Sequence, residues 1–349
     1  MKKQTNDLFA ADYRLQKLRQ YTNVLNTLTT LVDWAALARI VNAATKRGAD
    51  QPKGGRPGYP TEALVKIIVL QQLYGNLSDE DTEYALLDRG SWQRFIGMAE
   101  ARNLPDARTI WHFKNQLAQT NSARALFDDV QRQLNQAGLT AKGGQMIDAT
   151  IVPAPKMHFS KEEKASIAAG ETPAHWTKKQ AAHKDTDAHW TAKRGQWYHG
   201  YKAHVNADQK HKLIRVVDVT PANQSDTTHF EPVIDTSVQR QQSGKTVHAD
   251  RGYDSAANRQ VLKKYQLRDG VARKDDAKRF DQTQIHGRNK KLSRIRARVE
   301  HVFGAWEKVI GKSIRCIGQV RATAQITWQA TVVNLRRWVS LDARDGSAA

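Results

Sequence analysis

Cysteine is almost absent from this chain of 349 residues, which contains only Cys316. A single cysteine excludes an intramolecular disulfide and a zinc site built from several cysteines, and it favours a reducing compartment, so we expect a cytoplasmic protein. Long hydrophobic runs are absent as well. No apolar stretch approaches the roughly 18 residues of a spanning helix, and the segment from Met1 to Asp7 lacks the apolar core of a signal peptide. A membrane protein is therefore not expected.

Acidic residues are scarce relative to basic ones. The chain has 35 Asp and Glu against 55 Lys and Arg, which gives a formal net charge of +20 at pH 7 and a sequence pI of about 10.0. Such an excess predicts a polyanionic partner, and the lack of membrane segments favours nucleic acid. Residues 1–142 carry a net charge of +5 and the remaining residues +15. Most of the excess therefore belongs to the C-terminal part.

The first 142 residues are predicted to be helical. Apolar residues recur at helical spacing over 18–32 and again over 61–75. The Gly- and Pro-rich stretch 48–60 between them is expected to be a linker or loop. The helices on either side of residues 74–77 resemble a helix-turn-helix. Helical hairpins with such turns also occur without DNA, so contact with DNA at this point is left open.

From Gly143 onward the pattern changes to short apolar runs that are typical of strands. Strands are predicted at 145–152, 198–207, 213–220, 245–249 and 268–273, and helices at 227–241, 255–265 and 292–312. This order predicts a mixed α/β sheet with helices packed on it. The basic stretch 153–196 is expected to be a surface loop or a partly disordered insertion. Residues 341–349 are expected to form a flexible tail.

Three acidic residues in this part occupy positions that suit metal-dependent chemistry. Asp148 lies within an apolar run, where a carboxylate is costly unless it meets a cation or hydrogen-bond donors. Asp250 follows a short strand-like run, and Glu300 lies at the edge of a helical apolar stripe that is surrounded by basic residues. Each has a structural alternative: a strand-end cap or a partner of an arginine for Asp148, a turn residue for Asp250, and an i,i+4 ion pair with Arg296 for Glu300.

Five short motifs give the chain a resemblance to a known family. They are MIDAT at 146–150, GYKAH at 200–204, TPAN at 220–223, ADRGY at 249–253 and RVEHVFG at 298–304. Together they look like the motifs of bacterial insertion-sequence DDE transposases, and most of all those of the insertion-sequence-five group. The segment LPDART at 104–109 resembles the leading helical domain of that group. The resemblance extends from about Tyr59 to Trp338, and its most specific parts are DRGY and VEHVFG.

The resemblance implies an RNase H-like catalytic domain at 143–340 and a helical domain at 1–142 that binds DNA ends. It makes Asp148, Asp250 and Glu300 the catalytic residues and metal ligands, on the first strand, after the fourth strand and on the following helix. Such oxygen ligands favour two Mg²⁺ ions, for which Mn²⁺ can substitute, over zinc. The implied activity is cutting at element ends and joining the 3′-OH to target DNA by two-metal phosphoryl transfer, carried out by a homodimer on double-stranded DNA.

The last helix departs from the signature of one related group of these enzymes. That signature consists of a tyrosine, an arginine, a glutamate and a lysine. Arg296 and Glu300 match it, but Ser293 stands at the place of the tyrosine and Glu307 at the place of the lysine. The helper functions of those two positions are therefore not transferred to this chain.

Basic residues near the three acids are expected to contact DNA. Lys202 and His204 share one face of their predicted strand and would border the site, although packing or simple exposure fits them equally well. Arg251, Arg296 and Arg298 are predicted contacts to the DNA backbone.

Three tryptophans, Trp176, Trp190 and Trp197, lie in or beside the basic insertion. Their rings could stack on unpaired bases, but we favour the alternative that they pin the insertion to the domain.

An RNase H-like nuclease without strand transfer would use the same carboxylates, and only a strand-transfer assay separates it from a transposase. A non-catalytic DNA-binding protein derived from a transposase is disfavoured, because it would have no physical reason to keep three costly carboxylates.

Overall fold

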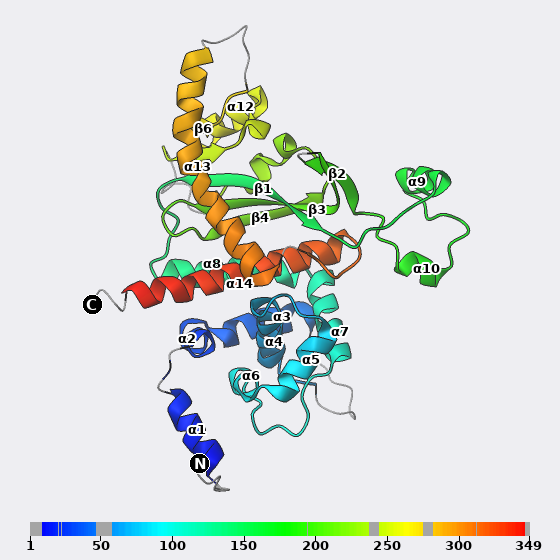
Figure 1. The fold of residues 1–349 in the computed structure, drawn as a ribbon, viewed down its shortest axis with the longest axis vertical. Helices are drawn as coiled ribbons and strands as arrows, with labels where there is room; N and C mark the ends of the chain where they lie inside the picture. The colour runs from blue at the N-terminus through cyan, green and yellow to red at the C-terminus, as the bar shows by residue number, and fades with distance from the viewer. Residues whose placement is uncertain are drawn as a thin grey trace, which may run out of the picture.

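The computed structural model (Figure 1) describes residues 9–19, 21, 23–46, 58–193, 195–236, 244–274, 282–311 and 313–345. The first part is helical, as predicted. Its helices are α1 (Ala10–Arg19), α2 (Val24–Leu31), α3 (Trp34–Thr45), α4 (Thr61–Leu73), α5 (Asp79–Asp88), α6 (Gly90–Phe95), α7 (Ala107–Gln119) and α8 (Ser122–Gln136). Most of the predicted linker 48–60 lies outside the described residues.

α4 and α5 form the predicted helical pair, but neither presents a basic face. α4 is buried along almost its whole length, so it is the central helix of the bundle. α5 begins with Asp79, Glu80 and Asp81, and the side chain of Ser78 caps it by accepting a hydrogen bond from the Asp81 N–H. An acidic first turn is poorly suited to lie on phosphate.

Within the described residues, the C-terminal part is built on a six-stranded mixed sheet, which confirms the predicted mixed α/β class; the RNase H-like assignment stays a prediction. The strands are β1 (Gln145–Pro153), β2 (His189–Lys193), β3 (Gln196–Asp208), β4 (Ile214–Pro221), β5 (Thr246–Ala249) and β6 (Arg268–Val271). The sheet order is β2-β3-β1-β5-β6, and β4 also pairs with β3. β3 runs antiparallel to β1, β2 and β4, whereas β5 lies parallel to β1 and β6.

β3 pairs with two strands along one edge, first with β2 and then with β4, and Gly200 lies where the partner strand changes. Its first residues pair with β2, and the pairing with β4 begins at Tyr201. Between them, Gly200 has φ +152°, and a Cβ there would lie 2.3 Å from the Val152 carbonyl oxygen. Only glycine permits this close approach of β3 to β1.

The two faces of the sheet pack against different helices. One face is covered by α13 (Gln282–Ile310) and α14 (Gln319–Asp345), and its cluster includes Met146, Val152, Val205, Val299 and Trp306. The other face carries η1 (Asp226–His229), η2 (Glu231–Val233) and α12 (Ala256–Lys264), and its cluster includes Ile147, Phe230, Val247, Tyr253 and Leu262. In Figure 1, α13 crosses the sheet and leads into α14.

Three predictions from the sequence need correction. The helix predicted at 227–241 is replaced by η1 and η2, and Pro232 lies at the start of η2, where its missing N–H is tolerated; residues 237–243 lie outside the described ones. The insertion 153–196 is ordered where it is described, with α9 (Lys161–Ala168), α10 (Lys178–Ala182) and β2. α14 was not predicted, and it includes 341–345 of the expected tail.

Membrane-spanning character is weak throughout the described ranges. No single described helix is long and apolar enough to cross a bilayer. Only α2 and α3 taken together reach that length and composition, and they are bent by 70° relative to each other.

Candidate active site

The parallel pairing of β1 and β5 makes Asp148 and Asp250 neighbours. The register pairs Met146 with His248, and each aspartate stands two residues further along its strand direction. Because side chains alternate along a strand, both aspartates belong to the face of that pair. Both carboxylates also influence the buried hydroxyl of Tyr253. The two aspartates therefore occupy equivalent positions, each two residues beyond the last registered pair of the two strands.

Asp250 is held by a tight turn directly after β5. It caps η3 (Arg251–Tyr253), and its Oδ1 accepts a hydrogen bond of 2.8 Å from the Gly252 N–H. A Cβ on Gly252 would lie 2.9 Å from the same oxygen. The glycine of the DRGY motif thus leaves room for the carboxylate.

Glu300 lies on α13, which packs against both β1 and β5. Its neighbours Val299 and Val302 are buried, as is Trp306, whose Nε1 donates to Gln329 Oε1 of α14 at 3.1 Å. Glu300 itself is exposed. The predicted position at the edge of a buried stripe is therefore what the structure shows.

The donors at the strand ends suit a hard divalent cation. Asp148 and Asp250 offer carboxylate oxygens, which magnesium and manganese prefer. Across the described ranges, however, no three His, Cys, Asp or Glu side chains converge closely enough to hold a metal ion. The register thus makes the two aspartates neighbours, but the described residues do not assemble them with a third carboxylate into a metal site.

A further carboxylate, Asp226, lies near the two aspartates and was missed from the sequence. Its Oδ2 would be 3.7 Å from a Cβ on Gly252, close to Asp250. Burial, and then the negative charges of Asp226, Asp148 and Asp250, raise the pKa of Tyr253. The only signal in the sequence was the position of Asp226 three residues after the TPAN motif.

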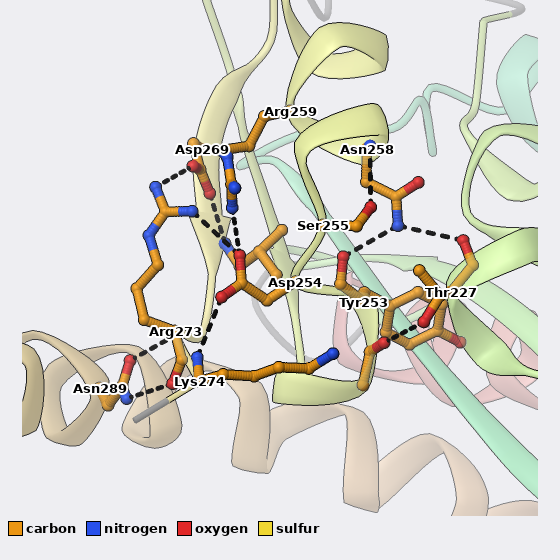
Figure 2. A network of polar contacts seen from close by, with 12 residues as sticks. Thr227, Tyr253, Asp254, Ser255, Asn258, Arg259, Asp269, Arg273, Lys274 and Asn289 are labelled. Atoms are coloured by element: carbon orange, nitrogen blue, oxygen red, sulfur yellow. Dashed lines mark hydrogen bonds and ion pairs between the residues drawn. The ribbon is translucent and has the colours of Figure 1, made fainter. Parts of the chain in front are cut away.

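A polar network connects this corner of the sheet to α13 (Figure 2). Asp254 accepts hydrogen bonds from Arg259, Arg273 and the Lys274 N–H. Burial alone would raise the pKa of Asp254, but the bonds from Lys274 and Arg273 hold it below its usual value. Asn289 of α13 then exchanges two hydrogen bonds, of 2.9 and 3.0 Å, with the backbone of Arg273.

Lys202 and His204 share one face of β3, as predicted, but it is not the face of Asp148. Asp148 lies opposite Val205, whereas Lys202 and His204 alternate to the other side. His204 is fully buried, stacks on His229 at 4.8 Å and lies 3.0 Å from Thr220 Oγ1. The prediction that His204 contacts phosphate is therefore wrong, because the ring does not reach the surface.

Lys202 binds the segment that follows β4. Its Nζ donates to the Gln224 carbonyl at 2.7 Å and to Asp226 Oδ1 at 2.9 Å, and its side chain is 14% exposed. The predicted phosphate contact is therefore replaced by an internal ion pair.

The DNA contacts predicted for three arginines stay predictions. Arg251 and Arg298 are exposed, while the side chain of Arg296 lies outside the description. One of the three tryptophans pins the insertion to the sheet, as favoured, because Trp190 packs on the ring of His199. Trp176 Nε1 donates to Glu163 Oε1 at 2.6 Å, which is a contact within the insertion. Trp197, in contrast, is 64% exposed.

Comparison with known proteins places the chain in a family. A family model described as a transposase DDE domain matches residues 140–335, and a second one, described as a transposase domain, matches residues 13–116. The expected transposase family is thus confirmed, whereas the insertion-sequence-five group stays a prediction.

Two solved structures resemble the chain weakly. One is a piggyBac transposase synaptic complex with hairpin DNA, at 10% identity and a TM-score of 0.43, covering 95% of this chain and 78% of that one. The other is a pre-cleavage Mos1 transpososome, at 12% identity and a TM-score of 0.21, covering 93% of this chain and 98% of that one. TM-scores of this size carry no structural argument. Because the DDE model covers more than half of the sequence, the protein belongs to the DDE transposases, which cut DNA and transfer its strands.

Proposed function

We propose that Asp148, Asp250 and Glu300 are the catalytic carboxylates of this transposase and that they bind two Mg²⁺ ions, with Mn²⁺ as a substitute. The observation that supports this most directly is the register of β1 and β5, since each aspartate follows the paired residues Met146 and His248 by two positions. Divalent cations held by such oxygens activate the attacking oxygen and stabilise the leaving oxygen of a phosphodiester.

Glu300 supplies the third carboxylate in this proposal because its helix covers the same face. α13 packs on β1 and β5, and the buried side chains of Val299 and Val302 fix the helix beside Glu300. The exposed carboxylate of Glu300 would hold a cation together with the aspartates, and the cation would offset the repulsion among the three charges.

The substrate is double-stranded DNA at the ends of an insertion element and at a target site. The enzyme hydrolyses a phosphodiester at the element end and then directs the released 3′-OH at the target strand. Arg251 and Arg298, which are exposed, and Arg296 bind the phosphate backbone. A homodimer holds the two ends, and the helical region 1–142 binds them.

Replacement of Asp250 by Asn tests the assignment. The variant keeps the size of the side chain and an oxygen that can accept from Gly252, but it removes the charge. We expect Mg²⁺-dependent cleavage of element-end DNA to be lost, while DNA affinity in EDTA stays within about threefold, since the phosphate contacts are unchanged.

The matched control is Asp218→Asn, because Asp218 lies on β4 and is paired with His229. It should cleave at the wild-type rate. Cleavage that survives in Asp250→Asn would refute the assignment. A strand-transfer assay with 3′-OH donor ends measures the joining step separately from cleavage.

A further inference from the structure

The ion pair between Lys202 and Asp226 is not explained by the catalytic assignment. Lys202 lies on β3, and Asp226 begins η1 in the segment after β4. Their side chains are 14% and 29% exposed, so the pair is largely screened from water. The lysine binds only one of the two oxygens, Oδ1.

The segment that carries Asp226 is attached to the turn that carries Asp250. Thr227 Oγ1 donates to the Gly252 carbonyl at 2.6 Å. Asn258 Nδ2 donates to the carbonyls of Thr227 and Tyr253, at 3.1 and 2.8 Å. Figure 2 shows Asn258 between these two carbonyls. Because both segments share these bonds, the positions of Asp226 and Asp250 are coupled.

The second carboxylate oxygen of Asp226, Oδ2, and the carboxylate of Asp250 both lie beside Gly252. Oδ2 of Asp226 and Oδ1 of Asp250 both lie within 4 Å of the position that a Cβ on Gly252 would take. Two carboxylates beside the same residue repel each other, and a cation near them offsets that repulsion.

A buried donor faces the same group of acids. The hydroxyl of Tyr253 is fully buried and has no hydrogen-bond partner among the described residues. The charges that act on it are those of Asp226, Asp148 and Asp250. A buried hydroxyl without a partner is costly, so a ligand that supplied an acceptor to Tyr253 would stabilise this corner.

We propose that Asp226 is a positioning residue for the divalent cation of the active site. It contributes negative charge from the sheet face opposite α13, and Lys202 and Thr227 fix its orientation. This inference rests on the proposed function, because it assumes that Asp148 and Asp250 are the ligands. Asp226 itself is not assigned as a ligand.

The test measures Mn²⁺ binding by electron paramagnetic resonance on the full chain without DNA. Asp226→Asn removes the charge but keeps an acceptor for Lys202. Thr227→Val is the matched variant, since it keeps the charge and the shape but loses the bond to Gly252. Thermal unfolding in EDTA shows that each variant is folded.

We expect Asp226→Asn to weaken Mn²⁺ binding on the order of tenfold and Thr227→Val to weaken it less than about threefold, because the effect is electrostatic. Unchanged binding in Asp226→Asn, or equal loss in both variants, would overturn the inference. Asp250→Asn distinguishes failure of the proposed metal site from failure of the inference about Asp226. If it binds Mn²⁺ like the wild type, the proposed site itself is wrong. If it loses binding while Asp226→Asn does not, only the function of Asp226 is wrong.

Discussion

At the scale of single residues, Gly252 controls where the carboxylate of Asp250 points. A Cβ at Gly252 would lie 2.9 Å from Asp250 Oδ1, the far end of a side chain that can rotate away. Gly252→Ala should therefore change the free energy of unfolding by less than about 1 kcal/mol. It should lower the cleavage rate on the order of 100-fold, because the carboxylate is displaced by about an ångström.

Cleavage kinetics and urea unfolding of the same preparation check this prediction. Gly287→Ala on α13 is the control, since a Cβ there meets nothing within 4 Å. It should keep the wild-type rate. A Gly252→Ala enzyme of normal rate would show that the turn tolerates a methyl group without moving Asp250.

His204 makes stability dependent on pH. Its burial, with a smaller contribution from His229, lowers the pKa to about 4 from 6.5. The unfolded chain therefore binds a proton near pH 6.5 that the folded chain refuses, and stability is lost as pH falls from 6.5 towards 4. Between pH 7 and pH 5 this histidine should cost about 2 kcal/mol of unfolding free energy.

Urea unfolding of wild type and His204→Gln at both pH values measures that contribution. Between pH 7 and pH 5, the free energy of unfolding of His204→Gln should fall by about 2 kcal/mol less than that of the wild type. The exposed His189→Gln should keep the wild-type dependence. Equal slopes for wild type and His204→Gln would mean that the imidazole is protonated inside the fold.

At the scale of elements, Asn289 anchors the N-terminal half of α13. Its side chain is 6% exposed and satisfies both the N–H and the carbonyl of Arg273. Asn289→Ala leaves two backbone groups without these partners and should cost about 2 kcal/mol of stability. Hydrogen exchange of α13 should rise, and cleavage should fall, because Glu300 lies on this helix.

Lys290→Ala provides the comparison for that variant, because Lys290 is the exposed next residue of the same helix. It should change neither exchange nor cleavage. If Asn289→Ala exchanges like the wild type, α13 is held by its apolar side chains alone.

The elements show how far local sequence patterns determine this structure. The strands with alternating or continuous apolar residues were predicted nearly to the residue, and so was the position of Asp148. The helix at 227–241 failed because Pro232 interrupts a helical pattern with a residue that cannot donate. β2 was missed because its residues are mostly exposed and polar, and only pairing with β3 makes them a strand.

The candidate site was predictable only where it lies within motifs. Asp148, Asp250 and Glu300 were named from the sequence. The burial of His204 was not, because a difference of one residue in register decides which face a side chain joins. Asp226 could not be found either, since the contact of its segment with Gly252 is made through tertiary structure.

At the scale of the whole molecule, the helical region and the sheet share one hydrophobic cluster. That cluster includes Leu64 of α4, Phe127 of α8, Val205 of β3 and Leu335 of α14. A boundary at residue 142 therefore marks a change of secondary structure within a continuous core. We propose on this ground that the two parts unfold together.

Arg215 tests that proposal, because it forms a buried ion pair within the sheet and also donates a hydrogen bond to the helical part. It is 7% exposed, pairs with Asp208, which is 1% exposed, at 3.2 Å, and donates to the Leu139 carbonyl at 2.6 Å after α8. Arg215→Leu leaves Asp208 without its cation and should cost about 3–5 kcal/mol. Hydrogen exchange should then accelerate in α4 as well as in β3. Arg132→Ala is the control, since Arg132 pairs with Asp129 on its own helix. Normal protection of α4 in Arg215→Leu would instead establish two independently stable domains that meet at residue 142.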